Sequence, residues 1–342
     1  RIFTQHDDGY FLEIMREEGK MIIRDWLPLA TPATVNNLCL ALLEDRERLI
    51  DAALFRRSRE KIIGLLDGSF DLTTGKLRNC TSTDLCLTPL PHRLHHLPYT
   101  PAADAWFCGI LASWVGEECA DWFCHALAYC LFVSPNTEQV WMNFFGMGSN
   151  GKSICLKLLE RILGDEKVIG CDLANINRFS NATFKNKWLM IGRDSSSFVS
   201  DTATSFIKNY SGDDKGLVEV KGGGSFDAYT EGKLIVSTNT LIQSKDRTFS
   251  WFRRLFPVPF PYTFPRNPAF ERGVMARLPE ILRVLLHRAY CYTKNAATLT
   301  DSMPHAVQEL LTETRYLNDR VAAYWETEFF TLDQQPMTDK FM

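Results

Sequence analysis

A glycine-rich stretch in the middle of the chain, FFGMGSNGKS at residues 144–153, has residue types that suit phosphate binding. Its glycines, lysine and serine follow the pattern Gly146-x4-Gly151-Lys152-Ser153. Glycines let backbone N–H groups curl around an anion, and no Cβ blocks the approach of its oxygens. A lysine neutralises β- and γ-phosphate charge, and a serine hydroxyl is a ligand for Mg²⁺. The stretch therefore predicts a site for a nucleoside triphosphate with Mg²⁺.

The elements expected on either side support this interpretation. A buried-strand candidate, EQVWMNFF, precedes the loop, and an amphipathic helix pattern, KSICLKLLERIL, follows it. The phosphates would then lie at a helix N-terminus, where unpaired N–H groups and the helix dipole favour negative charge. We expect Gly148, Ser149 and Asn150 to complete the nucleotide site.

Polar residues at the ends of three later apolar runs could supply the rest of a hydrolytic site. The run WLMIGRD ends in Asp194, KLIVSTN ends in Asn239, and FRRLFPVPF begins with Arg253 and Arg254. An acid after a neighbouring strand can hold Mg²⁺ or polarise the attacking water, and an amide can orient that water. A guanidinium inserted from another subunit stabilises transition-state charge, with Arg254 our first choice. The competing local acid is Asp201.

The hydrophobic patterns also indicate how the chain is organised. Strands that alternate with helices predict an α/β fold with a parallel sheet covered on both faces, of the P-loop type. The expected regions are an N-terminal helical and small-β region at 1–100, helical within most of 1–62, a helical region at 101–136, the ATPase core at 137–262, and a C-terminal helical or winged-helix-like region at 263–342.

Composition and charge exclude some classes of protein. A hydrophobic content of 45% and a charged content of 23% are ordinary for a globular chain of 342 residues. No apolar run reaches the length of a bilayer span, so we expect no membrane partner. A net charge of −3 is not typical of a nucleic-acid-binding protein, but the net charge of a chain does not reveal a locally basic channel. The absence of an initiator Met indicates a fragment of a longer protein.

The order and spacing of the motifs resemble the superfamily 3 helicase domain of phage, plasmid and poxvirus-type primase-helicases, an AAA+-like ATPase. The motifs lie between about 140 and 260, and the resemblance covers about 60–325. Members of that family are ring-forming ATPases, usually hexamers, that move 3′→5′ along single-stranded DNA and part a duplex. Many carry a primase-polymerase module before the helicase.

The resemblance implies a role for each motif residue. Lys152 and Ser153 are the phosphate and metal residues, and Asp194 is the Walker B acid and second metal residue. Asn239 is the sensor. Arg254 or Arg253 is the finger that acts in trans.

The resemblance also implies a hairpin that projects into the pore of the ring. Here it corresponds to NYSGDDKGLVEVKGGGSFDAY, with Lys221 at or near the tip and Lys215 as a second DNA-binding residue. A cation on a glycine-flexible tip can grip a DNA phosphate. The hairpin is poorer in Lys and Arg than the family pattern, so Lys185, Lys187 and Lys233 are alternative sources of charge.

The sequence thus predicts an ATP-dependent DNA helicase of DNA replication, with single-stranded DNA, the replication fork and copies of itself as partners. The expected location is the cytoplasm of a cell that hosts a phage, plasmid or other mobile element, or the replication compartment of a virus. One alternative is a P-loop ATPase that remodels protein or packages DNA. Another is a non-hydrolysing, nucleotide-dependent assembly module for an attached polymerase.

Overall fold

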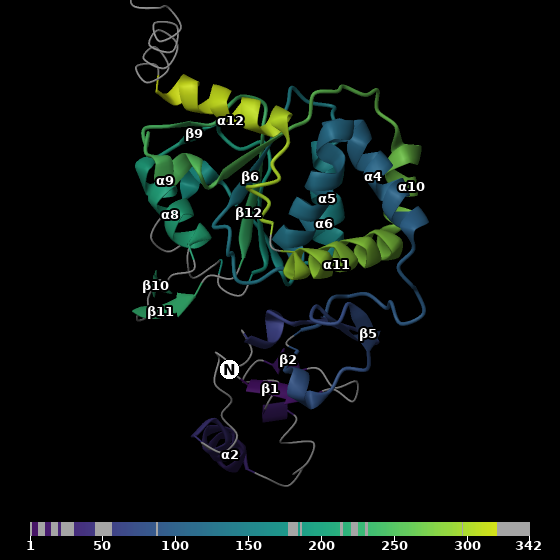
Figure 1. Ribbon diagram of the computed structural model, residues 1–342. Coiled ribbons are helices and arrows are strands. Elements are labelled where there is room, and N and C mark those ends of the chain that lie inside the picture. The colour runs from purple at the N-terminus through teal and green to yellow at the C-terminus, as the bar shows by residue number, and fades with distance from the viewer. Residues whose placement is uncertain are drawn as a thin grey trace, which may run out of the picture.

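Figure 1 shows the computed structural model of the chain. It describes residues 2–5, 11–14, 20–21, 31–44, 57–86, 88–176, 184, 187–212, 215–219, 225–229, 232–295 and 297–319. Within these residues, no helix combines the length and the apolar character that crossing a bilayer requires.

A five-stranded parallel sheet forms the centre of the molecule, in the order β14-β6-β12-β8-β7. Its strands are nearly continuous apolar runs, as expected of parallel strands buried on both faces. Four of them confirm strands expected from the sequence, and the short β7 was not expected. They are β6 (Trp141–Phe145), β7 (Val168–Gly170), β8 (Leu189–Gly192), β12 (Lys233–Thr238) and β14 (Leu255–Pro259).

Helices cover both faces of this sheet, as the sequence predicts (Figure 1). Alternate strand residues enter two separate apolar clusters: Met142 and Phe144 pack with the larger helical layer, and Trp141 packs with the smaller one. The larger layer contains α4 (Pro101–Val115), α5 (Glu117–Phe132), α6 (Lys152–Leu163) and α11 (Leu278–Lys294), and the smaller one contains α8 (Asp201–Ser211) and α9 (Phe249–Phe252).

The aromatic residues of α4 and α5 mostly belong to this core. Trp114, Trp122 and Phe123 are buried. Trp106 is half-buried and lies under the guanidinium of Arg277, 3.7 Å from the ring centroid. The cysteines of α5 are also buried: Cys119, Cys124 and Cys130.

The C-terminal segment contributes helices to the same core. After α10 (Pro268–Ala276), α11 packs on α4 and α5, and α12 (His305–Asn318) lies along β14. Figure 1 shows α12 across the top of the sheet. Within 263–295 and 297–319 the structure has helices and no strand.

The N-terminal segment departs from the expected helical pattern. β1 (Ile2–Gln5) and β2 (Phe11–Ile14) pair in an antiparallel sheet. The expectation of a mostly helical segment did not include these strands, although short alternating runs around an Asp-Gly pair are a hairpin pattern. α2 (Pro32–Glu44) follows as expected, and Oγ1 of Thr31 accepts the N–H of Thr34 at 3.2 Å.

A small antiparallel sheet packs beneath the main body (Figure 1). It contains β3 (Ile62–Leu65), β4 (Gly68–Asp71) and β5 (Lys76–Arg78), as the short alternating runs predict. Phe70 and neighbouring apolar residues belong to the same cluster as α4 and α11. His92 reinforces the junction, since its Nε2 lies 3.0 Å from the carbonyl oxygen of Ile162 in α6.

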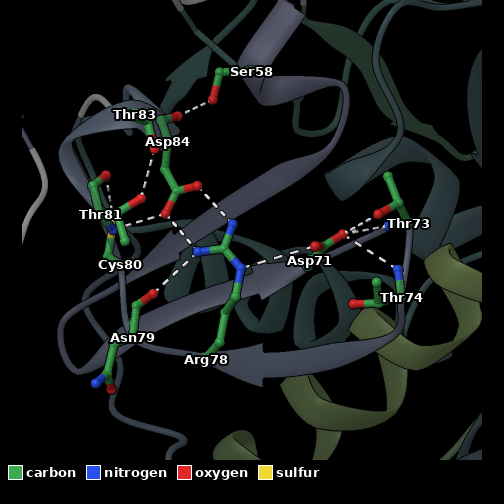
Figure 2. A network of polar contacts seen from close by, with 10 residues as sticks. All are labelled: Ser58, Asp71, Thr73, Thr74, Arg78, Asn79, Cys80, Thr81, Thr83 and Asp84. Atoms are coloured by element: carbon green, nitrogen blue, oxygen red, sulfur yellow. Dashed lines mark hydrogen bonds and ion pairs between the residues drawn. The ribbon is translucent and has the colours of Figure 1, made fainter.

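A polar network ties the loop after β5 to this small sheet (Figure 2). Arg78 forms a two-pronged contact with Asp84, at 2.7 and 2.6 Å, and its Nε lies 3.9 Å from Asp71. Burial raises the pKa of Asp84, but the hydrogen bonds from Arg78 and from the N–H of Thr81 outweigh burial and lower it. The network fixes the short helix Ser82–Asp84 on the sheet.

The remaining elements are short. β10 (Lys215–Glu219) and β11 (Ser225–Tyr229) form an antiparallel hairpin that stands away from the main sheet, below α8 (Figure 1). β9 (Phe198–Val199) pairs in parallel with β13 (Gln243–Ser244), and Leu173–Asn175 forms a 3-10 turn.

Candidate active site

The carboxyl ends of β6, β12 and β8 meet at one edge of the parallel sheet. Gly146, Asn239 and Asp194 follow these three strands at that edge. The sequence led us to expect the strand of the acid to neighbour that of the loop. The observed order instead puts β12 between them, so that Asn239 follows the strand that separates Asp194 from the glycine loop.

Lys152 is the best-defined residue of this edge. It is the first residue of α6, only 5% of its surface is exposed, and its Nζ donates to the carbonyl oxygen of Gly146. It also donates to Oδ1 of Asn239 at 3.2 Å. Burial lowers the pKa of Lys152, and the nearby charge of Asp194 partly offsets this. Both atoms that accept its hydrogen bonds are neutral oxygens, so the buried ammonium is poised for an anion.

The backbone of the loop requires glycine at its two pattern positions. At Gly151 φ is +94°, and an added Cβ would lie 2.6 Å from the ring of Trp114. At Gly146 an added Cβ would lie 2.4 Å from the carbonyl oxygen of Phe260. Gly148, with φ +105°, has nothing within 4 Å of its added Cβ. The loop is therefore packed against the protein at its ends and open in the middle.

A segment after β14 holds the loop from outside, and the sequence analysis missed it. The side-chain amide of the buried Asn150 donates to the carbonyl oxygen of Phe260 at 3.1 Å. The N–H of Phe264 donates to the carbonyl oxygen of Ser149 at 2.7 Å. We expected Asn150 to donate to a phosphate, and its amide here anchors the loop. The proline- and aromatic-rich run that follows the strand was the available signal.

The proposed metal residues lie in exposed positions. Ser153 is exposed in the first turn of α6. Asp194 is exposed two residues after β8, with φ +45°, and its N–H donates to Oγ of Ser237 at 3.1 Å. Ser237 lies in β12, the strand that precedes Asn239, and it thus positions the backbone of Asp194. The competing acid, Asp201, lies in the first turn of α8 and follows the short β9.

The two arginines lie at the amino ends of the strands, opposite to the glycine loop. Arg254 immediately precedes β14, whose first residue pairs with Trp141 at the start of β6. The loop begins beyond the other end of β6, about 20 Å away at the rise of a strand. Arg253 donates through Nη2 to Oε1 of Gln139 at 2.5 Å, and Arg254 donates to the carbonyl oxygen of Ser250. The structure does not bring either arginine to the loop of its own chain.

The expected DNA-binding lysines are only partly visible. Lys221 lies outside the described residues, as does Lys185, and Lys215 is the first residue of β10. The structure contradicts Lys233 as a DNA-binding residue, because it is 1% exposed and donates to the carbonyl oxygen of Val133. Lys187 is half-buried and donates to the carbonyl oxygen of Glu166 at 2.6 Å.

One family model matches the part of the sequence that begins at the glycine loop. The model of a family described as "Family of unknown function (DUF5906)" matches residues 144–254, from the glycine loop to Arg254. That match covers less than half of the chain. No curated protein matches the chain.

Several solved structures are similar in fold. Two apo structures of the C-terminal region of NrS-1, one of them in an A form, each have 13% identity and a TM-score of 0.49 and cover 75% of this chain. Another A-form apo structure of that region has a TM-score of 0.47 at the same identity. The chain spans 64–65% of these neighbours. At these values the likeness assigns no activity.

Proposed function

We propose that the chain is the motor domain of an ATP-driven DNA helicase of superfamily 3 type. Its loop at 146–153 would bind ATP with Mg²⁺, and hydrolysis would drive movement along single-stranded DNA. The observation that carries the proposal is the buried ammonium of Lys152, held by two neutral oxygens at the sheet edge where Asn239 and Asp194 also lie. A buried cation that donates its hydrogen bonds to neutral oxygens favours an anionic ligand.

The contacts of Lys152 suggest how the site responds to a nucleotide. In the structure, Nζ donates a hydrogen bond to Oδ1 of Asn239. A phosphate that takes over Nζ releases this amide, which is then free to orient the attacking water. Asp194 supplies a carboxylate at the same edge to polarise that water. Ser153 and Asp194 are the residues that would hold Mg²⁺, which when bound neutralises charge on the β- and γ-phosphates.

The position of the arginines supports a shared site. Arg253 and Arg254 lie at the far edge of the sheet from their own loop, so a role at the γ-phosphate requires a second copy of the chain. Head-to-tail contacts of this kind close into a ring. We therefore propose a homo-oligomeric ring, a hexamer by resemblance, in which each site forms between two subunits.

The hairpin β10–β11 is the element that we propose for DNA contact. It stands away from the main sheet (Figure 1), which is the arrangement that an element projecting into a pore requires. A ring repeats the few cations of each hairpin, including Lys215 and Lys221, around one strand. A chain of net charge −3 can therefore present a positive pore, and its DNA binding should weaken with salt.

A phosphate-release assay with and without single-stranded DNA tests the function. The unchanged chain should hydrolyse ATP faster with DNA, and Lys152→Ala should lose at least about 100-fold in rate, since transition-state charge loses its main cation. Lys157→Ala is the matched control, because Lys157 is an exposed lysine of the same helix that pairs with Glu271 at 2.8 Å. It should keep full activity.

Two outcomes of this assay favour the alternatives. If the unchanged chain forms nucleotide-dependent oligomers without turnover, it is an assembly module. If Lys221→Ala keeps DNA-stimulated hydrolysis and duplex unwinding unchanged, the proposed grip on DNA is wrong and a remodelling ATPase becomes the better description.

A further inference from the structure

A pocket is lined by none of the residues to which a role was assigned above. It forms where the segment before α4 meets α11, and its lining includes Tyr99, Thr100 and Ala103 on one side and Glu280 and Arg283 on the other. Its volume is about 180 Å³. This pocket contains a charged group with unusual surroundings.

That group is the guanidinium of Arg283. The residue is 9% exposed, and its Nε and Nη1 are buried without a hydrogen-bond acceptor. On one side the guanidinium lies over the ring of Phe70, 5.0 Å from the centroid. An arginine keeps its charge in a protein, so burial leaves donors and a positive charge that need an acceptor.

The carboxylates near the pocket are already engaged elsewhere. Glu280 accepts from Nε of Arg277 at 3.0 Å. Asp104 accepts from Nε of Arg288 at 3.0 Å and from the hydroxyl of Tyr99 at 3.0 Å. Neither acid therefore neutralises Arg283, and the pocket retains a net attraction for an anion.

The start of α4 adds to this attraction. Thr100 caps the helix, and its Oγ1 accepts the N–H of Ala103 at 3.2 Å. The helix is 15 residues long and has a dipole whose positive end is its N-terminus. This end lies at the wall of the pocket, because Thr100 and Ala103 line it. The buried guanidinium of Arg283 and the N-terminus of α4 are independent features, and both favour an anionic ligand.

We propose that this pocket binds a phosphate-sized oxyanion through Arg283. The volume accommodates such an ion with a few waters, each of which takes about 30 Å³. It is below the range of about 300–1,000 Å³ for larger organic ligands, which excludes a whole nucleotide. The ion is either free phosphate or one phosphate of a nucleic-acid backbone. Since Phe70 belongs to β4, the bound ion would strengthen the junction between the small sheet and α11.

Thermal unfolding during a titration with inorganic phosphate tests the proposal. The titration uses Lys152→Ala, so that the glycine loop does not contribute. The midpoint should rise by about 3–5 °C when phosphate reaches about a hundredfold excess over Kd. Adding Arg283→Met should abolish this rise, whereas adding Arg272→Met, which removes an exposed arginine of α10, should leave it unchanged.

The design separates loss of binding from loss of fold. Without phosphate, Arg283→Met should melt no lower than its parent, because it removes an uncompensated buried charge and keeps the apolar stem. Calorimetric titration of phosphate into Lys152→Ala gives a second reading that needs no pocket variant. Absence of binding heat there, or a phosphate-dependent rise that survives Arg283→Met, overturns the proposal.

A short single-stranded oligonucleotide identifies the source of the ion. If it competes with inorganic phosphate for Lys152→Ala, and Arg283→Met removes the competition, the pocket takes a backbone phosphate. If phosphate binding is unaffected by the oligonucleotide, the ligand is the free ion.

Discussion

The contact between Lys152 and Asn239 links the phosphate-binding loop to the residue that we propose to orient water. The two side chains are joined by a hydrogen bond. On the proposed function, phosphates would compete for the lysine and leave the amide to the water, so Asn239 would act in the chemical step and contribute little to binding.

Replacement of Asn239 separates these two roles. We expect Asn239→Ala to lower kcat by about 100-fold and to leave KM for ATP within about threefold, since the lost contact acts in the transition state. Steady-state hydrolysis measures both constants, with Thr240→Ala, at the exposed next position, as the control. A variant whose KM rises while kcat stays constant would show that the amide binds substrate instead.

Gly151 carries a second prediction at the scale of single residues. Gly151→Ala should abolish ATP binding and lower the melting temperature, because φ is +94° and the new Cβ would meet the ring of Trp114 at 2.6 Å. Gly109→Ala is its control, since Gly109 lies inside α4 with nothing near its added Cβ. That change should stabilise the chain by about 0.5–1 kcal/mol. Equilibrium nucleotide binding and thermal melting of both variants check the pair, and unchanged binding in Gly151→Ala contradicts the packing argument.

The sequence predicted the polar residues at the ends of the strands better than the residues that hold them in place. The loop and the polar strand ends are local patterns, so spacing alone was enough to propose Lys152, Asp194 and Asn239 as candidates. Ser237 and Phe260 contact the site only because of the order of the strands and the path of the chain after β14. No local pattern contains that information.

At the scale of elements, Lys167 joins the small sheet to the core. It follows α6, is 4% exposed, and donates to the carbonyl oxygen of Thr88. Its Nζ also lies 5.0 Å from the ring centroid of Trp188. Burial lowers the pKa of Lys167 from 10.5 to about 8, with smaller contributions from neighbouring charges.

This pKa makes the stability of the fold depend on pH. Between about pH 8 and 10.5 the unfolded chain holds a proton that folded Lys167 has lost, so the contribution of this residue to stability rises with pH. The full effect is at most about 3 kcal/mol. Between pH 7.5 and 10, the free energy of unfolding measured with denaturant should rise less, or fall more, in Lys167→Met than in the unchanged chain and in Lys157→Met, an exposed control. Buried cysteines with a raised pKa, such as Cys130, lower the stability of all three in this range, so the difference between the variants is the measure. An equal pH dependence in Lys167→Met contradicts the assignment.

From residue 101 onward, most helices and strands were predictable from the sequence. Long periodic helices such as α5 and α11, and apolar strands such as β12, have strong local signals. The three-residue β7 is too short to show a period. The hairpin β1–β2 was missed because the helical patterns of the following segment were extended over it, although the Asp-Gly turn pattern was present.

At the scale of the whole molecule, the account depends on a site shared between copies. Because β6 and β14 are parallel, the loop after β6 and the arginines before β14 lie at opposite ends of the strands, and one chain would contribute to two of the proposed shared sites. The sequence indicated these residues and their order. It could not indicate which strands are neighbours, because register and strand order arise only when the sheet assembles.

Mixing two inactive variants tests this claim most directly. One chain carries Lys152→Ala, and the other carries both Arg253→Ala and Arg254→Ala. With Mg²⁺, ATP and single-stranded DNA, we expect each alone to hydrolyse ATP at about 1% of the normal rate or less. An equal mixture should recover up to about a quarter of it, because about one interface in four pairs an intact loop with intact arginines. A mixture that stays inactive, or an arginine variant that is active alone, contradicts the shared site.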